Sequence, residues 1–477
     1  MIYYINLSSR SDKNEFMLSQ PAEHKLFRIE ANQSISDSGI KINEKYSYQD
    51  EMYLCLSSHI KAMKKGTSSL EPFFWIAEDD VVLPSESDLA LLLKEKPEDA
   101  EVIQCCAISN YAVSRGKEEL KKGNLFFEWV NAYKSTAFYG ITREAALKFI
   151  DKFGDFDFSE TEKIYPDFLI YDELKTYTTS YPFAVTDTTF DSDIVHKIRE
   201  GFISPTLQAI EFQEKGRVLV DLFKLKGKKV YYIQNIGNAG DALINQSTFD
   251  YFELIGLDYE VINWYDARNL KEEIIIYGGG GSLVRYYSHC KRALEGIIHC
   301  NQMILLPCTV EGHEDFLRSA GSNLTIYCRE RISYDYLKKI NHKINVFMSE
   351  DMALRYESNA FTKANSKKVL KVFREGVEGI SRKPCNDISV TLNNADWWRS
   401  ANCKSVVDSF FNYINEYQEV HTNRLHVAIA ASLLDKEVTL YDGSYYKNRA
   451  VYEFSLSNNP KIKIEDGYKK SSSTTVC

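Results

Sequence analysis

The sequence predicts an α/β protein made of two successive α/β regions. Apolar strand-like segments alternate with helical segments along most of the 477 residues, as they do in sheets covered by helices. Residues 203–228 are helical and partly charged, and they separate one such run from the next. Glycine turns and polar residues follow many of the strands, which is where open α/β sheets bind ligands.

Composition and charge narrow the classes of function. The chain is 44% apolar and 26% charged, like an ordinary soluble globular protein. Its net charge of −9 argues against nucleic acid or an acidic membrane as the main partner, so any anion site must be local. Ten cysteines without framework spacing predict reduced thiols. The start MIYYINLSSR lacks a signal peptide, and no long apolar run spans a membrane, so we expect a cytoplasmic protein.

The first α/β region is expected to span residues 1–202. Ser85 with Asp88 resembles a capping box, and Thr142 is a cap for the helix that follows it. The predicted strands are residues 2–7, 26–31, 73–83, 101–108 and 135–141, and the predicted helices are residues 53–66, 88–96 and 143–153.

The second region is expected to span residues 229–477, after a helical linker at residues 203–228. We expect lobes at about residues 229–345 and 346–465 and a disordered tail, and Gly256 should end a helix. Strands are predicted at residues 229–234, 272–277, 303–308, 324–330, 344–351, 368–375, 387–392 and 437–442, and helices at residues 244–256 and 425–434.

Three carboxylates follow the apolar strand FFWIA: Glu78, Asp79 and Asp80. Adjacent carboxylates raise one another's pKa unless a cation neutralises them, and Mn²⁺ or Mg²⁺ is the usual partner in nucleotide-sugar chemistry. An acidic turn or a helix cap explains the same residues without a metal ion.

The order of segments in this region resembles the lipooligosaccharide galactosyltransferase family (glycosyltransferase family 25), which has a GT-A-type fold. The segments are YYINLSSRSDKNEF, LFRIEA, YLCLSSHIKAM, FFWIAEDDVVL and STAFYGITREAALKFID. The resemblance implies a UDP-galactose donor, a metal ion held at Glu78, Asp79 and Asp80, and a nucleotide lined by Asn6, Leu7 and Arg10. It also implies Asp167 or Asp172 as base or acceptor contact, although YPDFLIYD departs from the family's usual wording there. His59 is either a packed helix residue or a functional one.

Two glycine-bearing turns follow strands of the second region. NIGNAGDAL leads from a strand into a helix, and its glycines allow close approach of backbone N–H groups to an anion. Four glycines, Gly278 to Gly281, come directly after the strand EEIIIY. They serve either close contact with a ligand or a tight turn between packed layers.

The segment TNRLHVAIAASLLDKEVTLYDGS places Arg424 and His426 in the first turn of an apolar helix. A helix N-terminus already carries positive potential, so cationic side chains there suggest an anionic ligand. Alternatively, the arginine lies at the surface and the histidine at the edge of the core.

Six ordered motifs resemble the polysaccharide pyruvyl transferase family, whose fold resembles the two-lobed GT-B architecture. They are GNAGDALI, YGGGGSL, LLPCTV, YCRERISYDYL, SEDMAL, and NRLHVAIAASLLDKEVTLYD with YYKNRAVYE. The resemblance implies phosphoenolpyruvate as donor, a pyruvate ketal as product and no cofactor for this region. It implies that Arg329 and Arg424 grip phosphate or carboxylate and that His426 is the general acid. The cleft would be shaped by Asn238, Asp241, Gly279, Gly280, Gly281, Ser282 and Ser333, with Asn448 and Arg449 as weaker candidates.

Together these patterns predict a bifunctional enzyme of bacterial surface polysaccharide synthesis, as in capsule or lipopolysaccharide. Its acceptor would be a glycan or a lipid-linked oligosaccharide, which leaves peripheral association with the inner face of the cytoplasmic membrane open. A second hypothesis has two glycosyltransferases, the latter using CMP-sialic acid or CMP-Kdo. In a third, one region has lost catalysis and only binds glycan. Trp397 and Trp398 either stack on a sugar or belong to the core.

Overall fold

The computed structural model describes most of the chain: residues 1–20, 23–38, 41–42, 50–106, 109–155, 157–159, 165–191, 199–299, 301–361, 367–374, 378–379, 386–393 and 400–467. Trp397 and Trp398 lie outside these residues, as do residues 468–477 of the tail that is predicted to be disordered. The chain divides into two compact units, Met1–Gln213 and Glu214–Cys477. The division falls within residues 203–228, and each unit is described here by itself.

A mixed seven-stranded sheet forms the centre of the first unit. Its strand order is β2-β1-β4-β8-β6-β10-β7. Strands β1, β2 and β4 are parallel, whereas β8 is antiparallel to both β4 and β6, and β7 is antiparallel to β10. The strands are β1 (Ile2–Asn6), β2 (Leu26–Glu30), β4 (Phe73–Glu78), β6 (Val102–Gln104), β7 (Phe126–Glu128), β8 (Phe138–Thr142) and β10 (Thr176–Thr179). Two short pairs are separate: β3 (Lys41–Ile42) with β9 (Asp157–Phe158), and β5 (Val81–Val82) with β11 (Val185–Thr186).

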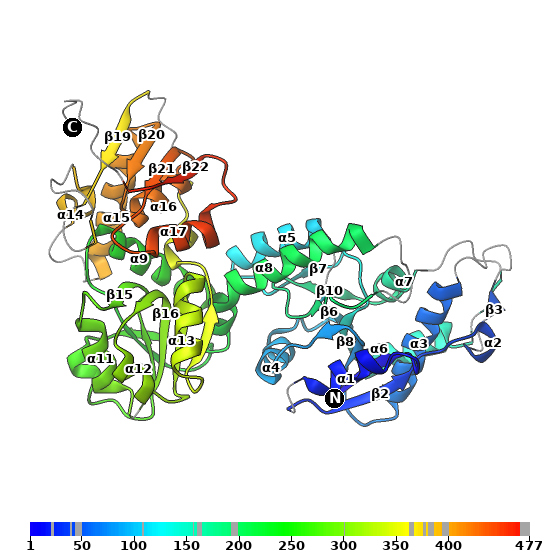
Figure 1. Cartoon of the computed structure of the whole chain (residues 1–477). Helices are drawn as coiled ribbons and strands as arrows, with labels where there is room; N and C mark the ends of the chain where they lie inside the picture. Colours follow the sequence, from blue (N-terminus) through cyan, green and yellow to red (C-terminus); the bar gives the residue numbers. More distant parts are fainter. Residues whose placement is uncertain are drawn as a thin grey trace. The chain divides into compact units, whose positions relative to one another are not determined.

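Helices pack against this sheet and bury its apolar side chains. Residues of α3 and α6, which contact each other, share one core with β4 and α7 (Figure 1). The Ser85–Asp88 capping box and the Thr142 cap are both present, which confirms these two predictions. The helices are α1 (Ser11–Ser19), α2 (Ile35–Ser38), α3 (Asp50–Thr67), α4 (Glu86–Glu95), α5 (Asn110–Lys121), α6 (Arg143–Phe153) and α7 (Pro166–Glu173).

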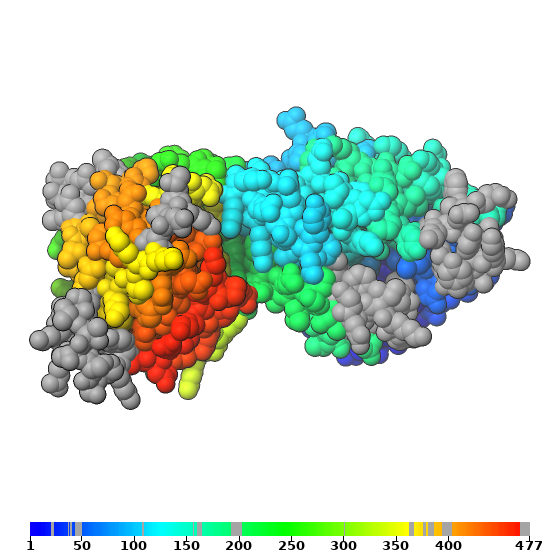
Figure 2. Space-filling model, turned by 90° about the horizontal axis from the view of Figure 1, so that it is seen from above, coloured from blue at the N-terminus to red at the C-terminus, as the bar shows by residue number. Residues whose placement is uncertain are grey.

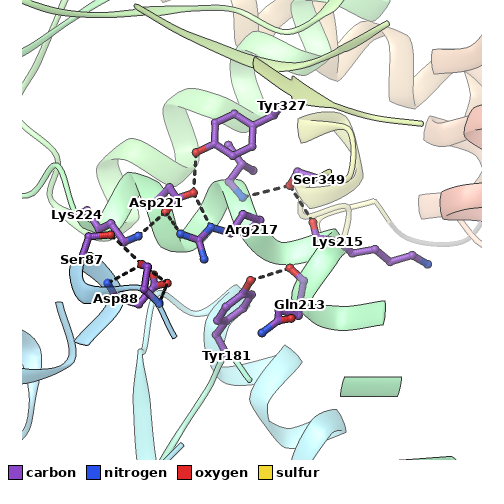
Figure 3. Close-up of polar contacts among 12 residues, drawn as sticks. Ser87, Asp88, Tyr181, Gln213, Lys215, Arg217, Asp221, Lys224, Tyr327 and Ser349 are labelled. Atoms are coloured by element: carbon purple, nitrogen blue, oxygen red, sulfur yellow. Dashed lines mark hydrogen bonds and ion pairs between the residues drawn. The ribbon is translucent and has the colours of Figure 1, made fainter. Parts of the chain in front are cut away.

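Helix α8 (Arg199–Phe223) carries the division between the units, and each of its parts is held by its own unit. In the first unit, the Tyr181 hydroxyl donates to the Gln213 carbonyl oxygen at 2.7 Å (Figure 3). In the second, the Tyr327 hydroxyl donates to Asp221 Oδ2 at 2.7 Å, and the Ser349 hydroxyl donates to the Lys215 carbonyl oxygen at 2.9 Å. The last turns of α8 are therefore part of the second unit's fold.

Two parallel sheets form the second unit. The first has the order β13-β12-β14-β16-β17-β18, with β15 also paired to β16, and the second has the order β19-β20-β21-β22. The first contains β12 (Val230–Ile233), β13 (Tyr259–Val261), β14 (Ile274–Tyr277), β15 (Gly280–Val284), β16 (Gln302–Glu311), β17 (Leu324–Cys328) and β18 (Asn345–Met348). The second contains β19 (Val369–Val372), β20 (Glu419–Thr422), β21 (Glu437–Tyr441) and β22 (Ile462–Glu465). The chain is thus mixed α/β with several parallel sheets.

Helix α9 follows β12 of the first sheet and packs against α15 and α16, which flank β20 of the second sheet (Figure 1). It therefore connects the two sheets of this unit. In Figure 2, the last part of the second unit, coloured orange to red, forms one continuous stretch of surface. Gly256 ends α9 with a left-handed φ of 67°, which confirms its predicted role. The helices are α9 (Ala239–Ile255), α10 (Trp264–Ala267), α11 (His289–Ile297), α12 (Glu314–Ser319), α13 (Arg331–Ile340), α14 (Ile388–Thr391), α15 (Ser400–Asn415), α16 (Leu425–Leu433) and α17 (Lys447–Val451).

One predicted strand of this unit is wrong. Residues 388–391 of the predicted strand at 387–392 form the short helix α14, although their β-branched side chains favour a strand. Asp387 precedes the helix, and α14 packs against α9, so tertiary contacts override the local preference. In the part of the chain that the structure describes, no helix combines the length and apolarity needed to cross a bilayer.

Candidate functional site

A cavity of about 200 Å³ lies in the second unit and is lined from both of its sheets. The first sheet supplies Gly281 and Ser282 on β15 and Arg329 directly after β17. The second supplies Arg374 after β19 and Lys447 at the start of α17. The N-terminal ends of α9 and α16 complete the wall with Asn238, Asp241, Arg424, Leu425 and His426. The cavity therefore lies at carboxyl ends of parallel strands, as expected for an open α/β sheet.

Asp351 connects an arginine and a histidine of this cavity. The Arg329 Nη1 donates to Asp351 Oδ2 at 2.6 Å, and the Arg329 Nε donates to the Thr309 hydroxyl at 3.0 Å. The same Asp351 oxygen lies 3.4 Å from His426 Nε2. Burial alone would raise the pKa of Asp351, but Arg329 and His426 hold it well below its usual range. A buried carboxylate thus fixes both side chains in place.

Arg424 immediately precedes α16, and Asp387 engages one edge of its guanidinium group. The Arg424 Nε donates to Asp387 Oδ1 at 3.0 Å, and Nη2 donates to Asp387 Oδ2. The N-cap residue provides no side-chain acceptor for the first turn of α16. The positive end of the helix therefore meets the cavity at Leu425 and His426.

A second charged cluster contains Lys447, Glu378 and Arg374. Lys447 and Arg374 both donate to Glu378 Oε2, Arg374 at 2.9 Å. Burial lowers the pKa of Lys447 to about 8, although Glu378 opposes this shift. Burial acts to raise the pKa of Glu378, but Lys447 and Arg374 bring it down to about 2. Four cationic residues (Arg329, Arg374, Arg424 and Lys447) and two acidic ones (Asp241 and Glu378) line the cavity, while Asp351 and Asp387 pair with Arg329 and Arg424 from outside its lining.

Two glycines hold the cavity open. A Cβ on Gly240 would lie 2.6 Å from His426 Nδ1, so only glycine allows α9 to approach this histidine so closely. A Cβ on Gly281 would point toward Arg329, 3.5 Å from Nη2. Asn238 and Asp241 form a capping box at the start of α9, with Asp241 Oδ2 accepting from the Asn238 N–H at 2.8 Å.

Several predicted cleft residues are not among those that line the cavity. Gly279 packs against the Pro307 carbonyl oxygen, and Gly280 has a φ of 116° at the start of β15. The Ser333 hydroxyl accepts from the Val310 N–H at 2.7 Å and bonds Glu330 inside the fold. Asn448 supports the backbone at Asn423 and Tyr441, and Arg449 pairs with Asp442 and Asp466.

Sequence reasoning missed four charged residues of the site: Asp351, Arg374, Glu378 and Lys447. A usable signal existed for three of them. Asp351 and Arg374 lie at the carboxyl ends of predicted strands, where ligand-binding residues gather, and Asp351 and Lys447 lie within the quoted motifs SEDMAL and YYKNRAVYE. Glu378 lies in a stretch with no recognisable pattern, so no comparable signal indicated it.

A separate cavity of about 340 Å³ lies in the first unit. Leu7, Glu78, Asp79 and Asp80 line it, as does the buried Lys13. The Lys13 Nζ lies 3.3 Å from Asp79 Oδ1 and 3.2 Å from Asp80 Oδ2. An ammonium group therefore already contacts two of the three predicted metal ligands. Burial still raises the pKa of Asp80 to about 6.

Glu78 has different neighbours from the two aspartates. Its Oε1 accepts from the Thr136 hydroxyl at 3.0 Å and lies 3.6 Å from His59 Nε2. Among the described residues, the three carboxylates do not bring their oxygens together as one group, whereas Cys55, His59 and Glu78 do. The donor set therefore does not fit an Mn²⁺ or Mg²⁺ ion held jointly by Glu78, Asp79 and Asp80.

Some of the other predicted residues of the first unit form hydrogen bonds with residues of the cavity or their partners, and others lie away from it. Asn6 is buried and donates to Asp79 Oδ2 at 2.8 Å, while Arg10 pairs with Asp12. Asp167, at the start of α7, accepts from the Thr136 N–H at 2.9 Å, and burial and Glu78 raise its pKa. Asp172 is exposed on α7. Asp167 is thus linked to Glu78 through Thr136, and Asp172 is not.

Comparison with known proteins identifies the class of the second unit. Residues 238–445 match the family "Polysaccharide pyruvyl transferase", so the C-terminal region carries this family of transferases. Over 307 residues the chain is 22% identical to the "Putative pyruvyl transferase EpsO" of Bacillus subtilis (strain 168), with 54% of this chain and 94% of that protein covered. Lys447 lies just beyond the matched residues.

Solved structures with similarity to the chain include two from other bacteria. An uncharacterized protein of Klebsiella pneumoniae is 34% identical, covering 52% of this chain and 96% of that one, with a TM-score of 0.47. The glycosyltransferase GlyE of Streptococcus pneumoniae TIGR4 is 8% identical, covering 64% and 90%, with a TM-score of 0.25.

Proposed function

We propose that the C-terminal unit transfers pyruvate from phosphoenolpyruvate to two hydroxyls of a sugar, as a ketal, in polysaccharide biosynthesis. The observation that supports this most is the set of four cationic residues around a cavity of about 200 Å³. Drug-sized ligands occupy pockets of about 300–1,000 Å³, so this cavity suits a small polyanion better than a sugar nucleotide. The matched pyruvyl transferase family agrees with such a donor.

The charged residues have distinct roles in this proposal. The Nη2 edge of Arg329 and the free part of the Arg424 fork bind carboxylate and phosphate oxygens. His426, held by Asp351, donates a proton to the enol methylene or to the departing phosphate. The two acceptor hydroxyls bond to the central carbon of the donor and lose their protons. One proton balances the new methyl group, the other leaves with inorganic phosphate, and no oxidant is needed.

Phosphate release tests this proposal. The purified chain is given phosphoenolpyruvate and a pyranose with vicinal or 4,6-hydroxyls. It should release one phosphate per ketal formed, and ³¹P NMR measures this release. His426→Gln should slow release by at least about 100-fold, which is the usual contribution of a general acid. His421 pairs with Glu419 and Tyr441 away from the cavity, so His421→Gln is the matched control and should change the rate by less than about 3-fold. Equal losses in both variants would contradict the role of His426.

An acidic sugar nucleotide is the alternative donor for this unit. Arginine and histidine side chains also suit the carboxylate of CMP-sialic acid or CMP-Kdo. Release of CMP from these donors, without phosphate release from phosphoenolpyruvate, would favour that alternative over pyruvyl transfer.

For the N-terminal unit we propose glycosyl transfer from a nucleotide sugar, with UDP-galactose as the first donor to test. The cavity of about 340 Å³ and its acidic residues support this, and together the two units would make the chain bifunctional. The GT-A-like and GT-B-like assignments remain predictions, as does an Mn²⁺ or Mg²⁺ ion, which would have to displace Lys13 from Asp79 and Asp80. No UDP release from the wild-type chain would instead favour a unit that only binds glycan, and release that is unchanged in Asp79→Asn and Asp80→Asn variants would exclude these two carboxylates from the reaction.

A further inference from the structure

The N-terminal unit contains a group of metal-binding side chains different from the one its sequence predicts. Cys55 and His59 are four residues apart on α3, so their side chains share one face of the helix. Glu78 ends β4 beside them. One ligand atom from each residue lies within 4.8 Å of the other two. All three residues line the cavity of about 340 Å³, so an ion can reach them.

The buried imidazole of His59 supplies an independent observation. His59 is 1% exposed, and among the described residues its Nε2 has no partner at hydrogen-bonding distance. This nitrogen lies 3.6 Å from Glu78 Oε1, which is too long for a good hydrogen bond. Two ligand atoms of a tetrahedral zinc ion, each about 2.0–2.2 Å from the metal, lie about 3.4 Å apart. The observed separation is therefore close to that of two atoms sharing an ion.

The surroundings orient these ligands in the way that metal sites require. The other ring nitrogen of His59, Nδ1, lies 3.1 Å from the Tyr139 hydroxyl, so a proton on Nδ1 leaves Nε2 free to ligate. The Thr136 hydroxyl donates to Glu78 Oε1 at 3.0 Å and fixes the carboxylate. Such outer partners set the tautomer and orientation of first-row metal ligands.

The local charge also calls for a cation. Lys13 is engaged with Asp79 and Asp80, while burial and then the carboxylates of Glu78 and Asp167 raise the pKa of the Cys55 thiol. Two carboxylates oppose a free thiolate, which argues against Cys55 as an unassisted nucleophile. A dication reverses this: it binds the sulfur as thiolate, and the thiol proton leaves to solvent.

We propose that Cys55, His59 and Glu78 bind a divalent transition-metal ion of the zinc class in the N-terminal unit. Thiolate and imidazole ligands select such an ion over Mg²⁺ or Ca²⁺. Three protein ligands beside a cavity leave a fourth coordination position for water or a substrate oxygen, as in catalytic rather than structural zinc sites. The site does not depend on the function proposed for either unit.

Cobalt titration of the full-length chain tests the site. Co²⁺ is added to protein first stripped with a chelator, and absorption spectra are recorded. We expect one equivalent to bind and to give the near-ultraviolet charge-transfer band of a thiolate–Co²⁺ bond, which Zn²⁺ then removes by displacement. Cys55→Ser should abolish the band and weaken binding at least about 100-fold. Cys106→Ser is the matched control, because Cys106 is a second thiol of the same unit and its loss should leave the band intact.

Two further variants separate this site from its rivals. Tyr139→Phe removes only the partner of Nδ1, so it should weaken Co²⁺ binding by about 10–100-fold while the band remains at saturation. Asp79→Asn should leave the band unchanged. No thiolate band in the wild-type protein, or a band that survives Cys55→Ser, would overturn the proposal. The proposal would also be overturned if Mn²⁺ or Co²⁺ bound without giving a thiolate band and Asp79→Asn abolished that binding, since the ion would then lie on the aspartates.

Discussion

At the scale of single residues, Asp351 is the side chain on which the C-terminal site most depends. Its Oδ2 contacts both Arg329 and His426, and it is fully buried. Removing one partner from a buried ion pair leaves the other charge without compensation.

We expect Asp351→Asn to lower the free energy of unfolding at pH 7 by about 3–5 kcal/mol, measured by urea denaturation. Because the pKa of Asp351 is depressed in the folded protein, its contribution is present above the ordinary aspartate pKa of about 4 and is lost as pH falls. The gap between wild type and variant should therefore shrink below pH 4. A gap that is constant with pH would contradict the ion pair. Asp335→Asn, on the exposed side of α13, is the control and should change stability by less than about 0.5 kcal/mol.

Lys447 gives the anion site a pH dependence in the alkaline range. Its pKa of about 8 means that the ammonium loses its proton as pH rises through that value, and the positive charge in the cavity then falls. Phosphoenolpyruvate affinity, measured by calorimetry between pH 7 and 9.5, should weaken on the order of tenfold. Lys447→Met should bind weakly throughout and show a flatter profile. A wild-type profile that stays level through pH 9.5 would exclude Lys447 from binding.

The residues that sequence reasoning found and missed differ in a physical way. Arg329, Arg424 and His426 were predicted from motifs, and the structure brings them to one cavity with Gly281 and Ser282. Their counter-ions Asp351 and Asp387 were not predicted, nor was Glu378, which pairs with Arg374 and Lys447, since pairing between distant segments depends on tertiary structure. For the same reason, the Lys13 contacts with Asp79 and Asp80 could not be read from adjacent acidic residues.

At the scale of elements, helix caps were the most predictable features. The caps at Ser85, Thr142 and Gly256 follow from local hydrogen bonding and backbone geometry, which neighbouring residues determine. Residues 387–392 show the opposite case, because packing of α14 on α9 decides their conformation. The glycines after β14 were expected to make a turn or a ligand contact; Gly280 and Gly281 begin a strand paired to β16, and Gly281 also lines the cavity.

Two glycine substitutions test separately how the reaction depends on the position of α9 and on the volume of the cavity. Gly240→Ala places a methyl group 2.6 Å from His426 Nδ1 and 2.7 Å from its Cβ, so His426 must move. Gly281→Ala meets nothing closer than 3.5 Å, so it should fold with less than about 1 kcal/mol of change while its methyl group occupies ligand space.

For phosphoenolpyruvate turnover we expect Gly240→Ala to lower kcat most, because the proton donor is displaced. Gly281→Ala should mainly raise KM, on the order of tenfold. Steady-state phosphate release measures both parameters. A kcat loss in Gly281→Ala as large as that in Gly240→Ala would contradict this division of roles.

At the scale of the whole molecule, the division at Gln213–Glu214 assigns the last turns of α8 to the second unit. The Tyr251 hydroxyl donates to the Leu219 carbonyl oxygen at 3.0 Å, and the ring of Phe223 packs edge-on against Tyr251. Val218, Val220, Leu222 and Phe223 are all buried.

A fragment of residues 214–477 should therefore be more stable than one of residues 225–477. The shorter fragment loses at least two buried apolar side chains, each contributing about 1.5–3 kcal/mol, together with the Asp221–Tyr327 hydrogen bond. We expect the free energy of unfolding to differ by at least about 3 kcal/mol in urea titrations. Equal stabilities would show that α8 belongs to the first unit along its whole length.

The anion cavity of the second unit takes its walls from residues as far apart in sequence as Asn235 and Lys447. During synthesis on the ribosome, where earlier domains fold first, the N-terminal unit can complete its own cavity while this one still lacks Arg424, His426 and Lys447. Premature termination before residue 447 would leave a nascent chain with a finished first unit and buried acids that have lost their cations. Such truncated products should be preferred substrates for cellular proteases.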